Sequence, residues 1–467
     1  MASPWAKNLQ GMHRLTGAPY LPGCLSLLSG NRFKRMALDV DQIREQFPSL
    51  SVEDDFLPRI YFDNPGGTQV SRRVIDRMVW YLESDNANSG APFRTSEETD
   101  QLLAGSHEAV AAFLNAESGR EIVFGQNMTT LTFAMSRTLG RTMRSGDEIV
   151  VTRMDHDGNI SPWLFLAEDL DLTIRWLDFS PETYRYDLSE LDGLLNERTR
   201  LVAVNHASNA IGTINDVRSV ARRAHTAGAL VYVDAVQYAP HAAIDVRSLE
   251  CDFLVCSSYK FFGPHQGILW GREALLERLV PYKVRPCDDR LPVRFETGTL
   301  SHESIAGILG AIEYLEWLGE TMGEANENGP SFEEPAAKSG DPSSFSRLGL
   351  TLRSAMNAIR SYERGLCNTL LDGLGGIEGL RIHGLTRSED LDDRVPTVSF
   401  TMDGRTPREI NRHLSGHNIF AWDGDYYALE VIRRLGLEPT GGMLRIGLAH
   451  YNTEEEIGRL VDALKEL

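Results

Sequence analysis

The chain has 467 residues, of which 42% are hydrophobic, and its 66 acidic and 47 basic side chains give a net charge of −19. This length allows two or three domains with a large buried core. The acidic balance argues against nucleic acid as a partner, because binding to phosphates needs a cationic face. No apolar run approaches the roughly 18 residues of a membrane span, so we expect no membrane partner either.

The first 35 residues carry five basic side chains and no acidic one. Such a composition weakly resembles a mitochondrial transit peptide, and Met36 offers a second start for the chain. We therefore predict that residues 1–35 are an N-terminal extension, either disordered or targeting. Cytoplasmic localisation is the favoured expectation, with mitochondrial targeting as the alternative. Residues 36–60 are predicted to pack on a C-terminal domain.

Short β-branched runs alternate with helical patterns from about residue 61 to residue 300. The strand candidates are Glu121–Phe124, Glu148–Thr152, Thr173–Leu177, Leu201–Asn205, Leu230–Asp234 and Phe253–Ser257. Between them lie amphipathic stretches such as Asp216–Thr226. This alternation predicts an α/β fold with a large, doubly wound, mostly parallel sheet over residues 61–318. Ligands then bind beyond the carboxyl ends of the strands.

A polar segment separates this domain from a second one. Residues 319–346 are rich in Gly, Glu, Pro, Ser and Asn and are predicted to be a flexible insertion. A long helical pattern from about 348 to 374 then opens a smaller α+β domain, residues 347–467. Capping boxes at Thr406–Glu409 and Thr453–Glu456 mark two helix starts in that domain.

The five cysteines favour reduced thiols over a cross-linked or metal-bound framework. They are odd in number and scattered, at Cys24, Cys251, Cys256, Cys287 and Cys367, with no C-x-x-C pair. We therefore predict neither a disulfide framework nor a structural metal site.

Two charged side chains stand at the ends of apolar strand candidates. Asp234 ends the strand at 230–234, and Lys260 follows the strand at 253–257. Taken singly, the acid is most simply a local cap and the lysine a solvated charge. Together they match what pyridoxal phosphate requires, a carboxylate that keeps the pyridine nitrogen protonated and an amine that forms an imine. We predict this cofactor, held as a Schiff base on Lys260.

Two further segments follow strands. Asn127-Met128-Thr129 opens a helical stretch, where free N–H groups and hydroxyls make an anion site suited to the cofactor phosphate; an ordinary helix cap has the same pattern. His156 is either a ring that stacks on the cofactor or a structural loop histidine.

In order and spacing, these segments resemble the class V aminotransferase group of fold-type I pyridoxal-phosphate enzymes, most nearly its cysteine desulfurases. The resemblance runs from about residue 58 to 467, apart from the insertion. It implies that His156 lies over the pyridine ring. It also implies that Asn209 supports the cofactor hydroxyl, that Gln237 lies beside the phenolic oxygen, and that Ser257 binds the phosphate.

The same resemblance extends to substrate and partner. Arg445 resembles the arginine that clamps the substrate carboxylate, a planar anion that suits a bidentate guanidinium. The opening segment Tyr61–Thr68 makes Asn64 a candidate substrate contact. Thr299 lies in a turn that resembles the one completing the phosphate site of the neighbouring subunit, which implies a homodimer.

The sequence departs from the desulfurases at positions that matter for sulfur transfer. Tyr427 stands where they carry the catalytic cysteine, and Trp422 replaces an arginine of the same loop. A phenol cannot accept sulfane sulfur, because that step needs a thiolate. Tyr259 replaces the histidine before the Schiff-base lysine. If the chain is nevertheless a desulfurase, Cys287 is the candidate for the substitute nucleophile. Tyr259, Trp422 and Tyr427 are candidate substrate contacts.

These features predict an enzyme that acts on an amino-acid substrate through an external aldimine and carbanion or enamine chemistry. Asp234 keeps the electron sink protonated, and Lys260 shuttles protons. We favour a lyase-type step, either β-elimination or decarboxylating or aldol-type carbon–carbon chemistry with a carbonyl co-substrate, as in family members of fungal natural-product pathways. The aromatic loop, with Trp422, Tyr426 and Tyr427, forms either a lid over the site or part of the packing between the domains. Cysteine desulfurase, aminotransferase and racemase activities are the alternatives, as is a catalytically silent protein.

Overall fold

The structure is a computed structural model that describes residues 38–323 and 346–467. The predicted N-terminal extension and residues 324–345 of the predicted insertion lie outside the described residues. None of the described helices is long and apolar enough to cross a membrane.

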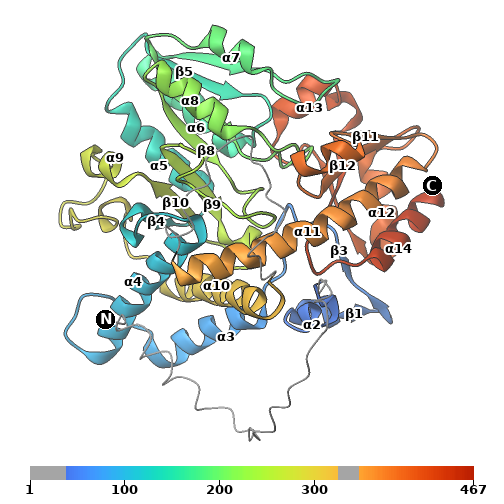
Figure 1. Ribbon diagram of the computed structural model, residues 1–467, viewed down its shortest axis with the longest axis horizontal. Helices are drawn as coiled ribbons and strands as arrows, with labels where there is room; N and C mark the ends of the chain where they lie inside the picture. Colours follow the sequence, from blue (N-terminus) through green and yellow to red (C-terminus); the bar gives the residue numbers. More distant parts are fainter. Residues whose placement is uncertain (1–37, 324–345) are drawn as a thin grey trace, which may run out of the picture. The chain divides into compact units, whose positions relative to one another are not determined.

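A seven-stranded sheet organises the first part of the chain (Figure 1). Its order is β4 (Ile122–Gly125), β10 (Gly267–Gly271), β9 (Phe253–Ser257), β8 (Leu230–Asp234), β7 (Thr199–Asn205), β5 (Glu148–Thr152) and β6 (Thr173–Leu177). The strands from β9 to β6 pair in parallel, while β10 runs antiparallel to both of its neighbours. The predicted mostly parallel sheet is therefore confirmed. The sequence prediction missed β10, whose three apolar residues stand between two glycines.

Helices cover both faces of this sheet. Along β8, Val231 and Val233 belong to one core and Tyr232 to the other. The first core contains residues of α4 (Arg94–Leu114), α8 (Val217–Thr226) and α10 (His302–Met322), and the second contains residues of α5 (Met128–Gly140) and α6 (Ser161–Leu170). A strand buried on both faces has apolar residues at every position, which is why these strands read as continuous runs.

A separate four-stranded antiparallel sheet organises the C-terminal part of the chain. Its order is β11 (Leu380–His383), β12 (Thr397–Met402), β15 (Met443–Gly447) and β14 (Trp422–Gly424). Its core is shared with α11 (Arg347–Gly375), α12 (Pro407–Gly416) and α14 (Glu454–Lys465). Both predicted capping boxes are present, at Thr406 with Glu409 and at Thr453 with Glu456.

The N-terminal segment joins this smaller sheet region. β3 (Ile60–Tyr61) pairs in parallel with β13 (Ile419–Phe420), and Arg44 of α2 (Val40–Arg44) bonds Glu456 of α14. The strand leads directly into residues 63–67, so this pairing fixes the start of the segment that reaches the candidate site.

The predicted helix that ends near Leu318 continues to Met322. Both residues lie on its buried face, and burial of that face extends the helix into the segment assigned to the insertion. The remaining described elements are β1 (Glu53–Asp54), β2 (Leu57–Pro58), α3 (Arg72–Trp80), α7 (Leu188–Leu194), α9 (Glu273–Arg278) and α13 (Leu429–Leu435), with short 3-10 and π turns between them.

Candidate active site

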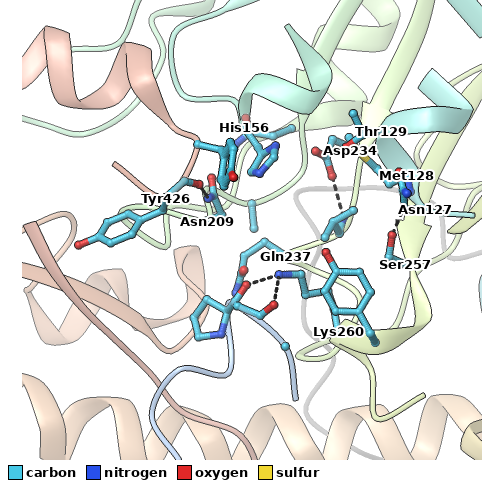
Figure 2. Close-up of a pocket in the computed structure, with 18 of the residues that line it drawn as sticks. Asn127, Met128, Thr129, His156, Asn209, Asp234, Gln237, Ser257, Lys260 and Tyr426 are labelled. Atoms are coloured by element: carbon cyan, nitrogen blue, oxygen red, sulfur yellow. Dashed lines mark hydrogen bonds between the residues drawn. The ribbon is translucent and has the colours of Figure 1, made fainter. Parts of the chain in front are cut away.

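The carboxyl ends of the parallel strands deliver polar side chains to one cavity of about 460 Å³. Asp234 ends β8 and Lys260 lies in the turn after β9, while His156 follows β5 and Asn127 follows β4 (Figure 2). Residues from the small sheet close the other side. The lining is Asp63, Pro65, Gly66, Gly67, Asn127, Met128, Thr129, His156, Asn205, Ala207, Asn209, Asp234, Val236, Gln237, Ser257, Tyr259, Lys260, Trp422, Tyr426, Tyr427 and Arg445.

The Lys260 amine is buried against main-chain carbonyls. Its Nζ donates to the carbonyl oxygens of Pro65 and, at 3.0 Å, of Gly66, and it lies 4.8 Å from the centre of the Tyr259 ring. Burial and the positive charge of Arg445 lower the pKa of Lys260 to about 7. A substantial fraction of the amine is then neutral near pH 7, and the neutral form is the nucleophile.

Asp234 is buried close to this lysine. Its Oδ1 accepts a hydrogen bond from the Val236 N–H at 2.8 Å. Burial raises the pKa of Asp234 to about 6, although the Val236 N–H and the Lys260 charge oppose that rise. A cationic donor such as a pyridinium N–H would favour the ionised carboxylate further.

His156 presents a neutral ring to the cavity. Its Nδ1 accepts the Gly158 N–H at 2.9 Å, so the proton of the neutral ring lies on Nε2. Burial and the nearby charges of Lys260 and Arg445 lower the pKa of His156 to about 4. The Tyr427 ring stacks near it, with 5.5 Å between centroids and 28° between planes. A flat, uncharged ring suits stacking on an aromatic cofactor.

The N-terminus of α5, beside β9, is the candidate anion site. The Asn127 side chain caps the helix by accepting the Thr130 N–H at 2.9 Å, and the Met128 N–H donates to Ser257 Oγ at 3.2 Å. Gly267 of β10 makes this approach possible, because a Cβ there would lie 2.4 Å from the Asn127 carbonyl carbon. The N–H groups and hydroxyls gathered at this helix N-terminus suit a phosphate.

Arg445 is buried on β15 at the far side of the cavity. One terminal nitrogen donates to the Asn209 carbonyl at 2.9 Å, and the guanidinium lies 4.4 Å from the centre of the Tyr426 ring. Burial lowers the pKa of Arg445 to about 10, which still leaves the group charged at neutral pH. A buried guanidinium of this kind recognises a carboxylate.

Four buried polar atoms of this cavity have no hydrogen-bond partner in the described part of the chain. They are Asp63 Oδ1, Asn209 Oδ1, Gln237 Oε1 and Arg445 Nε. Buried polar groups are rarely left unpaired, so their convergence on one cavity indicates a polar ligand. Together with the anion site, the residues present fit pyridoxal phosphate and a carboxylate-bearing substrate.

Nearly all of the candidate residues predicted from the sequence line this cavity. They are Asn127, Met128, Thr129, His156, Asn209, Asp234, Gln237, Ser257, Tyr259, Lys260, Trp422, Tyr427 and Arg445. Their individual roles stay predictions.

Asn64, predicted as a substrate contact, does not line the cavity. Its amide nitrogen donates to the Tyr61 and Gly447 carbonyls, and its oxygen accepts the Tyr451 hydroxyl, so both ends are engaged. The neighbouring Asp63 points into the cavity instead. Sequence reasoning missed it because the segment gives no sign of which side chain faces inward.

Thr299 does not line this subunit's cavity either. Asn205 and Tyr426 do line it, although the sequence predicted Asn205 only as the end of a strand and Tyr426 only as part of an aromatic lid. Tyr426 is buried, and its carbonyl accepts the Asn209 amide at 2.9 Å.

The chain is similar to proteins of one known family. The family model described as aminotransferase class V matches residues 60–329 and 347–460. The aminotransferase-like protein FGM3 of Gibberella zeae is 31% identical over 440 residues, covering 92% of this chain and 98% of that protein. A probable cysteine desulfurase of Synechocystis sp. is 32% identical over 438 residues, covering 91% and 94%. A solved cysteine desulfurase of Thermococcus onnurineus matches with a TM-score of 0.78 at 26% identity, covering 92% and 99%.

The fold, the cavity and the family match agree. The chain belongs to the class V aminotransferase family and is a pyridoxal-phosphate-dependent enzyme of fold type I.

Proposed function

We propose that this enzyme binds pyridoxal phosphate through Lys260 and cleaves a bond at Cα or Cβ of an amino-acid substrate, without taking sulfur onto a protein thiol. The observation that carries the proposal is the cavity itself. Apart from Thr299, the residues that we predict to bind the cofactor line it, but no cysteine is among the described residues that do so.

The described cysteines are poorly placed for a sulfur-transfer role. Cys251, Cys256 and Cys367 are buried, and burial raises the pKa of each thiol, which disfavours the thiolate. Cys287 does not line the cavity and has its Sγ against the Asp288 and Val293 carbonyls, at 3.7 and 3.6 Å. At the position of the desulfurase thiol, Tyr427 offers a phenol.

The side chains that line the cavity have separate roles in binding the cofactor and the substrate. When bound, pyridoxal phosphate supplies an electron sink for charge that develops at the substrate carbon. Asp234 would keep the ring nitrogen protonated, His156 would stack on the ring, and Asn209 and Gln237 would bond its phenolic oxygen. Arg445 would clamp the substrate carboxylate, a contact that orients the substrate.

Lys260 would also act as general base and acid at the substrate carbon once its amine is released. Because its pKa is lowered to about 7, both the protonated and the neutral amine are present near neutral pH, as a group that both accepts and donates a proton requires. Asp63, with one oxygen unpaired, lies in the same cavity and opposes the Lys260 shift by its charge.

The aromatic loop supports a reaction that needs water excluded. Trp422 and Tyr427 are 50% and 71% exposed at the mouth of the cavity. Tyr426 and Tyr427 both have positive φ, 55° and 57°, an unusual conformation for residues with a Cβ. The Tyr427 carbonyl accepts the Asp157 N–H at 2.6 Å, which ties the loop to the His156 segment. Such a lid favours elimination or carbon–carbon chemistry.

We also propose a homodimer in which Thr299 serves the neighbouring subunit's phosphate site. The turn at 297–299 is exposed, whereas the residue before it, Glu296, is buried. The Glu296 Oε1 accepts the Phe124 N–H at 2.9 Å and lies 2.8 Å from His107 Nε2. A turn held firmly on the sheet but directed to solvent suits a contact with a second copy of the chain.

The rate of cofactor attachment should report the lowered pKa of Lys260. When apo-protein is mixed with pyridoxal phosphate, the rate at which the visible band appears should rise through about pH 7 and level off above about pH 8, because only the neutral amine attacks. An ordinary lysine would keep accelerating towards about pH 10. Arg445→Gln removes a positive charge and should move the profile to higher pH, whereas the exposed Arg434→Gln should not. A rate that keeps rising at high pH would contradict this assignment.

Turnover of a panel of L-amino acids, with and without keto-acid or aldehyde acceptors, should identify the reaction. We expect products that have lost a group from Cα or Cβ, identified by mass spectrometry. Arg445→Lys should raise KM at least about tenfold, because lysine cannot form the bidentate pair; Arg408→Lys, on an exposed site, is the matched control. Conversion of cysteine to alanine with a persulfide on Cys287 would instead show a desulfurase, and keto-acid formation only with an acceptor would show an aminotransferase.

The dimer proposal predicts that cofactor affinity depends on subunit association. Thr299→Ala should weaken cofactor binding about tenfold through loss of a hydrogen bond to a charged group, although it leaves the subunit's own cavity unchanged. Thr440→Ala, a comparable exposed change, should have no effect. Binding titrations at several protein concentrations, with sedimentation to give the association state, measure this. Monomers with full cofactor affinity would overturn the shared site.

A further inference from the structure

A chain of four buried side chains lies behind the cavity wall at Gln237. The Gln237 amide nitrogen donates to Thr397 Oγ1 at 3.0 Å and lies 3.3 Å from His241 Nε2. His241 Nδ1 in turn lies 2.8 Å from Glu363 Oε2. The chain therefore runs from the turn after β8 to the long helix α11 and to β12 of the small sheet. Figure 2 shows Gln237 among the residues that line the cavity.

Each bond in this chain constrains the next. An ionised Glu363 can only accept, so the proton between it and the ring belongs to His241 Nδ1. The Nε2 of a neutral ring is then an acceptor, which takes the Gln237 N–H. This leaves Gln237 Oε1 on the cavity side, where it has no partner in the described part of the chain. The neutral ring thus presents a carbonyl oxygen to the cavity.

One added proton reverses the arrangement. A protonated His241 donates from both nitrogens, so Nε2 requires an acceptor and the Gln237 amide must turn to offer its oxygen. Thr397 Oγ1 can bond either end of the amide, because a hydroxyl both donates and accepts. The Gln237 N–H then faces the cavity. The hydrogen bonds that join the four side chains are kept in both arrangements, and an ionised Glu363 can pair with the protonated ring.

We infer that the His241–Glu363 pair is a positioning device that decides which end of the Gln237 amide meets the cofactor. The inference rests on the proposed cofactor placement, with the phenolic oxygen beside Gln237. An ionised phenolic oxygen requires a donor, so the pair stabilises that ionised form by turning the amide N–H towards it. His241 and Glu363 are thus positioning residues that act through Gln237.

Few other groups compete for control of this pair. The neighbouring ionisable groups are Arg360, Arg364 and Cys367 on α11, Arg394 before β12, His450 after β15 and Tyr314 on α10. Arg364 is paired with Asp392, and burial lowers the pKa of His450 to about 3, so that ring is neutral. The Arg394 guanidinium is bonded to the Leu385, Val395 and Thr397 carbonyls.

A small cavity lies beside the pair. It has a volume of about 20 Å³ and is lined by His241, Glu363 and the three arginines of this region. That volume has room for one water molecule, and Glu363 Oε1 is the unpaired acceptor beside it.

The test is a pH titration of the visible band of the lysine-bound cofactor. A hydrogen bond donated to the phenolic oxygen lowers the pH at which the proton shared by that oxygen and the lysine nitrogen is lost. Glu363→Gln removes the carboxylate that pairs with a protonated His241, so the midpoint should rise by about one pH unit. In a Gln237→Leu background the same change should have no further effect, because the amide that transmits it is gone.

A matched control comes from a second carboxylate–histidine pair. His225 and Asp252 lie 2.8 Å apart at the opposite end of the sheet, and Asp252→Asn should leave the midpoint unchanged. If Glu363→Gln does not fold, His241→Asn makes the same test with the same expected shift. An unchanged midpoint at full cofactor occupancy, or an equal shift in the Gln237→Leu background, would overturn the inference. A wild-type protein with no visible band would overturn the proposed function, and this inference with it.

Discussion

Removal of the Lys260 amine from water is the constraint on which the site depends. The amine stands at the carboxyl edge of a sheet whose strands are apolar on both faces, and its hydrogen bonds go to the Pro65 and Gly66 carbonyls. A buried ammonium loses solvation that these dipoles do not fully replace. The pKa falls to about 7, and an otherwise inert lysine becomes reactive near neutral pH.

The same low-dielectric surroundings act on the other ionisable groups, with opposite sign for acids and bases. Burial raises the pKa of Asp234 to about 6 and lowers that of His156 to about 4. Arg445 keeps its charge, and that charge helps to lower the pKa values of Lys260 and His156. A substrate carboxylate on Arg445 would offset part of this effect, so substrate binding and the protonation of Lys260 are coupled.

The sequence could predict the features that follow from local pattern. Buried parallel strands appear as apolar runs, and a polar residue at the end of such a run must reach the sheet edge. This pattern predicted Lys260 and Asp234 as site residues. β10 was missed because a short apolar run between glycines has no period. Family resemblance, and not local pattern, predicted the partners of the cofactor ring such as Gln237.

Side-chain direction in irregular segments was beyond sequence reasoning. Asn64 and Asp63 are adjacent, and only the contacts of Asn64 with Tyr451 and Gly447 show that Asp63 is the one facing the cavity. The His241–Glu363 contact joins residues 122 positions apart. Such contacts depend on how the long helix packs across the sheet, which no local propensity encodes.

Chemical reduction of the holoenzyme tests the central claim most directly. Borohydride fixes the cofactor to whichever amine holds it, and peptide mass spectrometry then locates the phosphopyridoxyl group. We expect modification of Lys260, at near one group per chain, and none of the retained cofactor fixed in a Lys260→Ala protein. The cofactor on another lysine, such as the exposed Lys465, would contradict it.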